Sequence, residues 1–206
     1  MPLHRLTLPR LPLPSLTLTR LPLAALALLA APALAEPLPG AQVDAMLFPP
    51  APVEVVAYTV EGLSQDEISL LTQVAASQKY YAAVAFAPAE GILAEPTVMA
   101  ANFHNVDAAR AAAIRQCNDR RQGGRACIIA FEVRPQGWEP RALQLSADAT
   151  EAFSAGFARA RAPRAFAISE ATGQFGAGSG ADAAAAALAD CRDAPGAGDC
   201  RIVIAD

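Results

Sequence analysis

The chain has 206 residues, of which 53% are hydrophobic, and its 16 basic and 20 acidic residues give a formal net charge of −4. All 20 acidic residues lie after residue 35, together with 13 of the basic ones, so this part carries a charge of −7. This net negative charge argues against a protein that binds nucleic acid over its whole surface. The same part contains one lysine, Lys79, and one histidine, His104, which excludes several enzyme classes.

Residues 1–35 have the composition of an export signal. Three arginines precede an apolar run at 21–35, and no acidic residue occurs there. Ala33 and Ala35 stand three residues and one residue before the bond to Glu36, the pattern that signal peptidase recognises. An uncleaved membrane anchor is the alternative, but the apolar run is shorter than the roughly 20 residues that span a bilayer. We predict a cleaved signal peptide, a periplasmic or secreted mature protein, and no stable membrane span after cleavage.

The next elements are a tether, a strand and a helix. Segment 36–52 holds five prolines and shows no period, which predicts a flexible tether. An N-terminal strand and helix follow over 53–79. The β-branched run at 53–60 predicts the strand, and Ser64 and Glu67 have the spacing of a capping box at the start of a helix of about a dozen residues.

Two segments, 80–133 and 164–206, repeat one order of features. In each, an apolar strand is followed by a turn with Pro or Gly, a second extended stretch and an alanine-rich helix that ends on a cysteine. A loop with Gly then leads to a second cysteine and a β-rich run. The helices open on Asp107 and Asp182, and an aspartate at this position accepts backbone N–H groups. We predict an α+β fold with two tandem strand-strand-helix-strand modules.

A connector, 134–163, joins the two modules. It contains a predicted helix from about Ala147 to Arg161, with Phe153 and Phe157 one turn apart on its buried face. Trp138 lies in the proline-rich part of the connector. This side chain is either an exposed aromatic contact or a large residue that pins the crossing of the chain.

Three glycines at 176, 178 and 180 precede the second alanine-rich helix, as in a phosphate-binding turn. A dinucleotide fingerprint has the spacing G-x-G-x-x-G and an acidic residue about 20 positions further on. Here the spacing is G-x-G-x-G, and the equivalent stretch of the first module has no glycine. We predict a strand-to-helix connection in which glycine eases the turn, and we expect no cofactor.

Four cysteines in an exported chain predict two disulfides. Three pairings are possible, and the repeat selects Cys117 with Cys127 and Cys191 with Cys200. Closing loops of about ten residues would stabilise each module by roughly 2.7 kcal/mol in the chain-entropy description. A four-cysteine zinc site is the alternative, but no C-x-x-C occurs. We therefore expect each module to be closed by a disulfide, and no metal.

The order of Tyr81-x-Ala-Val-Ala-Phe, turn, alanine-rich helix, Cys, short loop, Cys and apolar strand resembles a family of small bacterial secreted domains of unknown function. Proteins of this family carry one or two such modules, each closed by a cysteine pair, and the resemblance covers about residues 80–206. It implies a fold and leaves the activity open. Similar short proteins sometimes bear the name 5-aminolevulinate synthase. A pyridoxal-phosphate enzyme needs a Schiff-base lysine in a substantial cytosolic fold, and Lys79, at a predicted helix-to-strand boundary in an exported chain, does not support that activity.

The loops between the paired cysteines differ most in charge. Loop 118–126 carries Arg120, Arg121 and Arg125 and a net charge of +2, whereas loop 192–199 carries −1. Arginine binds carboxylate and phosphate groups, so these three side chains are candidates for contact with an anionic envelope component or a periplasmic protein. The alternative is a solvated loop whose arginines only offset nearby acids.

Three classes of function follow. The class that we favour is a non-enzymatic binding or interaction module of the cell envelope. An exported hydrolase that uses His104 is the second class, although the sequence has no G-x-S-x-G motif to supply a nucleophile. A purely structural periplasmic protein is the third.

Overall fold

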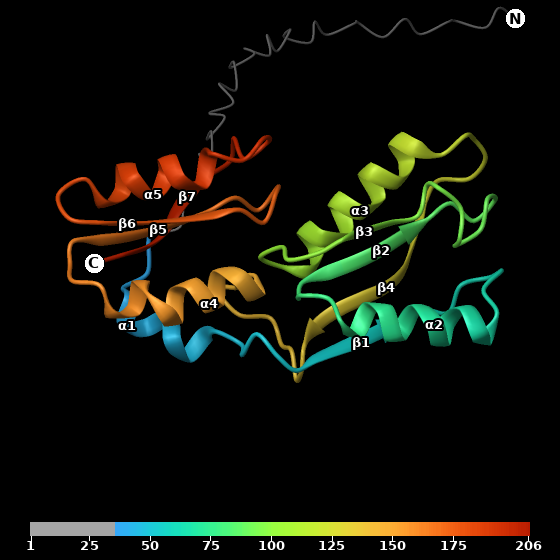
Figure 1. Cartoon of the computed structure of the whole chain (residues 1–206), viewed down its shortest axis with the longest axis horizontal. Coiled ribbons are helices and arrows are strands. Elements are labelled where there is room, and N and C mark those ends of the chain that lie inside the picture. Colours follow the sequence, from blue (N-terminus) through green and yellow to red (C-terminus); the bar gives the residue numbers. More distant parts are fainter. Residues whose placement is uncertain (1–35) are drawn as a thin grey trace, which may run out of the picture. The chain divides into compact units, whose positions relative to one another are not determined.

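The computed structural model describes residues 36–206, so the predicted signal peptide lies outside the described residues. Within this range the fold is α+β, with five α-helices, two short 3-10 helices and two antiparallel sheets (Figure 1). The predicted fold class is confirmed. No helix among these residues is long and apolar enough to cross a membrane.

The first sheet has the strand order β1-β4-β2-β3 and a helix on each face. On one face Val55 and Phe131 pack with Leu71 of α2, and on the other Ala83 packs with Ala109 of α3. Figure 1 shows α2 and α3 on opposite sides of these strands. The elements are β1 (Val53–Ala57), α2 (Gln65–Ala76), β2 (Ala82–Phe86), β3 (Val98–Ala100), α3 (Val106–Arg120) and β4 (Ile128–Pro135).

The second sheet has the order β6-β5-β7 and is covered in the same way. Ala165 and Ala167 pack with Ala187 of α5 on one face, and Phe166 packs with Phe153 of α4 on the other. The elements are α4 (Ala147–Ala155), β5 (Arg164–Ile168), β6 (Phe175–Ser179), α5 (Ala183–Arg192) and β7 (Arg201–Ala205).

The two modules have the same topology. In both, the first strand lies in the middle and pairs with the two others, and its pairing with the last strand shifts register at its centre, at Val84/Ala85 in β2 and at Phe166/Ala167 in β5. Both predicted disulfides are present. Cys117–Cys127 and Cys191–Cys200 each join the last part of the helix to the chain just before the last strand, with Cα atoms 6.1 Å apart.

The segment predicted to be a tether, 36–52, is part of the folded unit. Leu38 forms a parallel bridge to β7, donating to the carbonyl of Val203 at 2.9 Å. The helix α1 (Gly40–Val43) and the 3-10 helix η1 (Asp44–Met46) follow, and Val43 is fully buried in the core of the second module. The prediction was wrong because apolar side chains of this segment, Val43 and Phe48 among them, are buried in the hydrophobic cores, which the proline content did not reveal.

Helix starts agree only partly with the sequence prediction. The capping box of Ser64 and Glu67 is present. Asp107, by contrast, is the second residue of α3, whose cap is Asn105, and Asp182 precedes α5 without a side-chain capping bond. The two aspartates therefore do not cap their helices as predicted.

The connector helix ends earlier than predicted. α4 stops at Ala155, Gly156 follows, and the 3-10 helix η2 (Phe157–Arg159) completes the turn. Phe153 and Phe157 are buried as expected, with ring centroids 5.5 Å apart.

Two of the three glycines before α5 allow the strand β6 to pack closely against that helix. Gly176 and Gly178 lie within β6, and a Cβ atom on them would overlap backbone atoms of α5, the carbonyl oxygens of Ala187 and Ala183 respectively. Only Gly180, with φ +84°, is at a turn that favours glycine. The prediction that these glycines ease a strand-to-helix turn holds for Gly180 alone.

Candidate functional site

The loop between Cys117 and Cys127 is held in shape by its own side chains. The Oδ1 atom of Asn118 accepts hydrogen bonds from the backbone N–H of Cys127, at 3.1 Å, and from Nε of Arg121, at 2.9 Å. Nη1 of Arg121 donates to the carbonyl of Gly124 at 2.8 Å. Arg121 therefore uses Nε and Nη1 to hold the loop together, whereas the sequence suggested that its guanidinium would contact a partner.

A neighbouring turn supports the tip of the loop. The backbone N–H of Gln122 donates to Oε1 of Glu90 at 3.0 Å, and Gly124 lies against the methyl group of Ala89. The disulfide, the hydrogen bonds of Arg121 and this contact constrain the backbone of the loop.

Arg120 and Arg125 are the exposed cations of this loop. Within residues 36–206, neither side chain forms a hydrogen bond or an ion pair. Arg120 ends α3, where the helix dipole favours a cation. Of the three arginines that the sequence singles out, the structure thus leaves two free for an anionic group.

The corresponding loop of the second module uses one of its two acids, Asp199, in internal hydrogen bonds. Asp199 accepts hydrogen bonds from the hydroxyl of Ser169, at 2.5 Å, and from the N–H of Ala171, at 3.0 Å. Burial alone would raise the pKa of Asp199, but these hydrogen bonds outweigh it and lower the pKa below its ordinary value. The two loops therefore differ not only in charge: the first exposes two arginines, and the second holds Asp199 in internal hydrogen bonds.

Trp138 is half-buried and pins the connector. Its indole Nε1 donates to Oε1 of Gln144 at 2.7 Å, and the guanidinium of Arg134 stacks on the ring, 4.6 Å from its centroid. Of the two interpretations that the sequence allowed, these contacts favour a structural anchor.

A buried carboxylate that the sequence analysis missed lies beside this anchor. Glu132 of β4 is fully buried and forms ion pairs with Arg110 and Arg134, and the hydroxyl of Tyr58 donates to it at 2.7 Å. Burial and the hydrogen bond to Glu132 raise the pKa of Tyr58. The only sequence signal was a charged residue inside the apolar run that forms β4. The two arginines offset the charge of the buried carboxylate.

His104 is buried between the two modules and has no free ring nitrogen. Nδ1 accepts from the backbone N–H of Ser146 at 3.1 Å, so Nε2 carries the proton and donates to the carbonyl of Gln174 at 2.9 Å. Burial lowers its pKa to about 4. A general base needs an exposed lone pair within reach of a substrate, and His104 offers none here.

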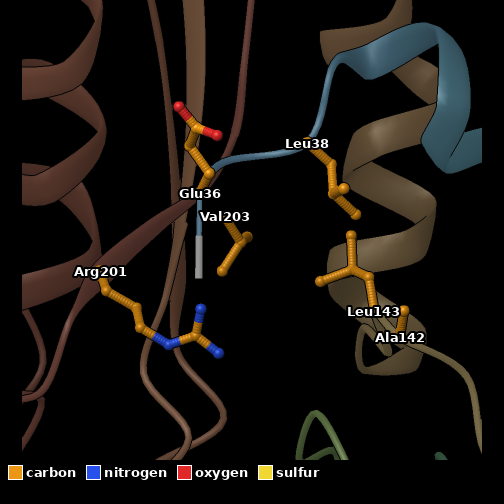
Figure 2. A pocket seen from close by; sticks show the side chains of 6 residues that line it. All are labelled: Glu36, Leu38, Ala142, Leu143, Arg201 and Val203. Carbon is orange, nitrogen blue, oxygen red and sulfur yellow. The ribbon is translucent and has the colours of Figure 1, made fainter. Parts of the chain in front are cut away.

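A hollow of about 180 Å³ lies at the outer edge of β7 (Figure 2). Leu38 and Leu143 point toward each other across it, and Arg201 lies at its other end. The guanidinium of Arg201 is already paired with Glu170, at 2.7 Å. The hollow therefore has largely apolar walls and no unpaired cation among its lining residues, which are Glu36, Leu38, Ala142, Leu143, Arg201 and Val203.

The described residues form an α+β fold built from two disulfide-closed modules, and the loop of the first module carries two exposed, unpaired arginines, Arg120 and Arg125. Comparison with models of protein families, with curated proteins and with solved structures finds no match to this chain. Within the described range, no group of three or more His, Cys, Asp or Glu side chains could hold a metal ion.

Proposed function

We propose that this chain is an exported protein of the cell envelope that acts as a non-enzymatic binding module for an anionic partner. The observation that carries the proposal is the basic loop 118–126, in which Arg120 and Arg125 are exposed while Asn118 and Arg121 fix the backbone. Exposed arginines on a fixed loop recognise carboxylate or phosphate groups at a low cost in ordering.

Export is supported by two independent features. The N-terminal sequence has the composition and cleavage pattern of a signal peptide, and all four cysteines are paired, as in an oxidising compartment. The resemblance to small bacterial secreted domains points the same way. An intact mass beginning at Glu36 and lighter by four hydrogens is the expected result for protein isolated from the periplasm. A mass that retains residues 1–35 with free thiols would contradict export.

The double variant Arg120→Ser/Arg125→Ser tests the binding site. We expect the wild-type protein to bind vesicles that contain phosphatidylglycerol, poly-L-glutamate, or both. Binding to the vesicles alone indicates recognition of phosphate, and binding to the polymer alone indicates recognition of carboxylate. The variant should bind at least roughly tenfold more weakly, because each arginine loses a charge-assisted contact. Affinity is measured by sedimentation with vesicles and by titration calorimetry with the polymer.

The matched control removes the same charge elsewhere. Arg159 and Arg161 are exposed, and within the described residues neither forms an ion pair, so Arg159→Ser/Arg161→Ser should leave binding nearly unchanged. An equal loss in both double variants would show attraction by net charge alone. That result, or no binding of either probe by the wild-type protein, overturns the proposal and leaves a structural role.

A further inference from the structure

Three of the four outer strands of the two sheets are protected against pairing with another chain. At the edge of β6, the outward N–H of Ala177 donates to the carboxylate of Asp190 at 3.2 Å. At the edge of β7, Leu38 bonds to Val203 and Ala205. β3 is only three residues long. Short edges, covered edges and charges at edges are the usual means of preventing edge-to-edge association.

Among the described residues, β1 is the outer strand whose outward backbone groups are neither covered nor bonded, and its one charged residue is Glu54. Its hydrogen bonds to β4 fall on even-numbered residues, because Tyr58 donates to Ala130 at one end of the ladder and Pro52 accepts from Gln136 at the other. The N–H and C=O groups of Val53, Val55 and Ala57 therefore point away from β4. Within residues 36–206, no hydrogen bond to these outward groups is formed. The strand itself contains no proline, no lysine and no bulge.

We propose that two copies of this chain associate by antiparallel pairing of β1 with β1 of the second copy, about a two-fold axis through Val55. Val55 then lies opposite its own copy, and Val53 lies opposite Ala57 of the second copy. Each of these residues has both backbone groups directed outward, so the pairing forms six hydrogen bonds and joins two four-stranded sheets into one. This surface is separate from the basic loop, and the inference does not depend on the proposed binding function.

Charge disfavours one of the neighbouring registers of this pairing. With the axis at Val55, Glu54 faces Val56 of the second copy, so no like charges lie directly opposite. A register centred on Glu54 would place two carboxylates opposite each other at the shorter, non-hydrogen-bonded spacing, which is destabilising. The strand is thus complementary to itself in the register centred on Val55. The register centred on Val56 brings no like charges together, but within β1 it pairs only Val55 with Ala57 and forms four hydrogen bonds instead of six. This self-complementarity favours a second copy over an unrelated extended peptide.

Ala57→Pro tests the pairing with little effect on the fold. The outward N–H of Ala57 does not bond to β4, the side chain is exposed, and proline is tolerated on an edge strand where the N–H faces solvent. The variant removes two of the six bonds and brings the proline ring against the partner backbone. Ala57→Ser keeps the N–H and is the matched control.

Sedimentation velocity over about 1 to 200 μM is the measurement. We expect a reversible dimer for the wild-type protein and for Ala57→Ser, and at least a roughly tenfold higher dimer dissociation constant for Ala57→Pro. Hydrogen exchange at the Val55 amide should slow with rising concentration in the first two proteins only. A wild-type protein that stays monomeric, or a dimer that Ala57→Pro does not weaken, would overturn the proposal. Slow exchange at Val55 that appears only when another protein is added would assign the edge to that partner instead.

Discussion

At the scale of single residues, His104 couples stability to pH. Burial lowers its pKa to about 4, whereas an unfolded histidine titrates near 6.5. Its contribution to stability is therefore complete above about pH 6.5 and is lost as the pH falls toward 4, because the unfolded chain then binds a proton that the folded chain does not. Between about pH 7 and pH 5 the free energy of unfolding should fall by about 2 kcal/mol. Guanidinium titrations at the two pH values measure it.

The control for this prediction removes the titrating group. His104→Gln keeps one acceptor and one donor on the side chain but has no proton to gain, so its stability should vary less over the same range. The charged groups nearest to His104 are Glu170, Asp199 and Arg201, and the carboxyl of Asp199 titrates below this window because its pKa is lowered. An equal pH dependence in both proteins would show that other groups cause it.

At the scale of elements, the contact of β6 with α5 depends on glycine. Gly178→Ala places a methyl group onto the carbonyl oxygen of Ala183, which belongs to the helix backbone and cannot rotate away. We expect a loss of about 3 kcal/mol in the free energy of unfolding, at the upper end of the range for overpacking. Gly198→Ala is the control, since no atom lies within 4 Å of its added Cβ. Its stability should change by less than about 0.5 kcal/mol. Equal effects of the two substitutions would contradict the close-packing role of Gly178.

The features that could be predicted from the sequence are those whose residues lie close together in the chain. The disulfides join residues 10 and 9 positions apart, and the capping box spans four residues, so their signals lie within short stretches of sequence. The role of Gly176 depends on the distance between a strand and a helix, which no local pattern reveals. Arg121 looked like Arg120 and Arg125 in the sequence. Only the fold shows that the guanidinium of Arg121 is hydrogen-bonded to Asn118 and Gly124.

At the scale of the whole molecule, the N-terminal segment acts as part of the core. Val43 is fully buried against the second module, so Val43→Ala should lower the free energy of unfolding by about 2 kcal/mol. Gln42 is exposed in the same helix, and Gln42→Ala should be nearly neutral. Thermal unfolding of the two variants measures the difference. If segment 36–52 were a flexible tether, neither substitution would change stability.

The contacts of Gly40 and Leu38 with the far end of the chain have a consequence for how the protein is made. Gly40 donates to the side chain of Asp206, 166 positions later, and Leu38 bridges to β7. Leu38 and Gly40 therefore cannot complete their native contacts until β7 and Asp206 have been synthesised, whereas each cysteine pair closes a short loop that can form independently. Long-range closure of this kind delays folding. The second module is therefore complete only after the last residues of the chain have been made.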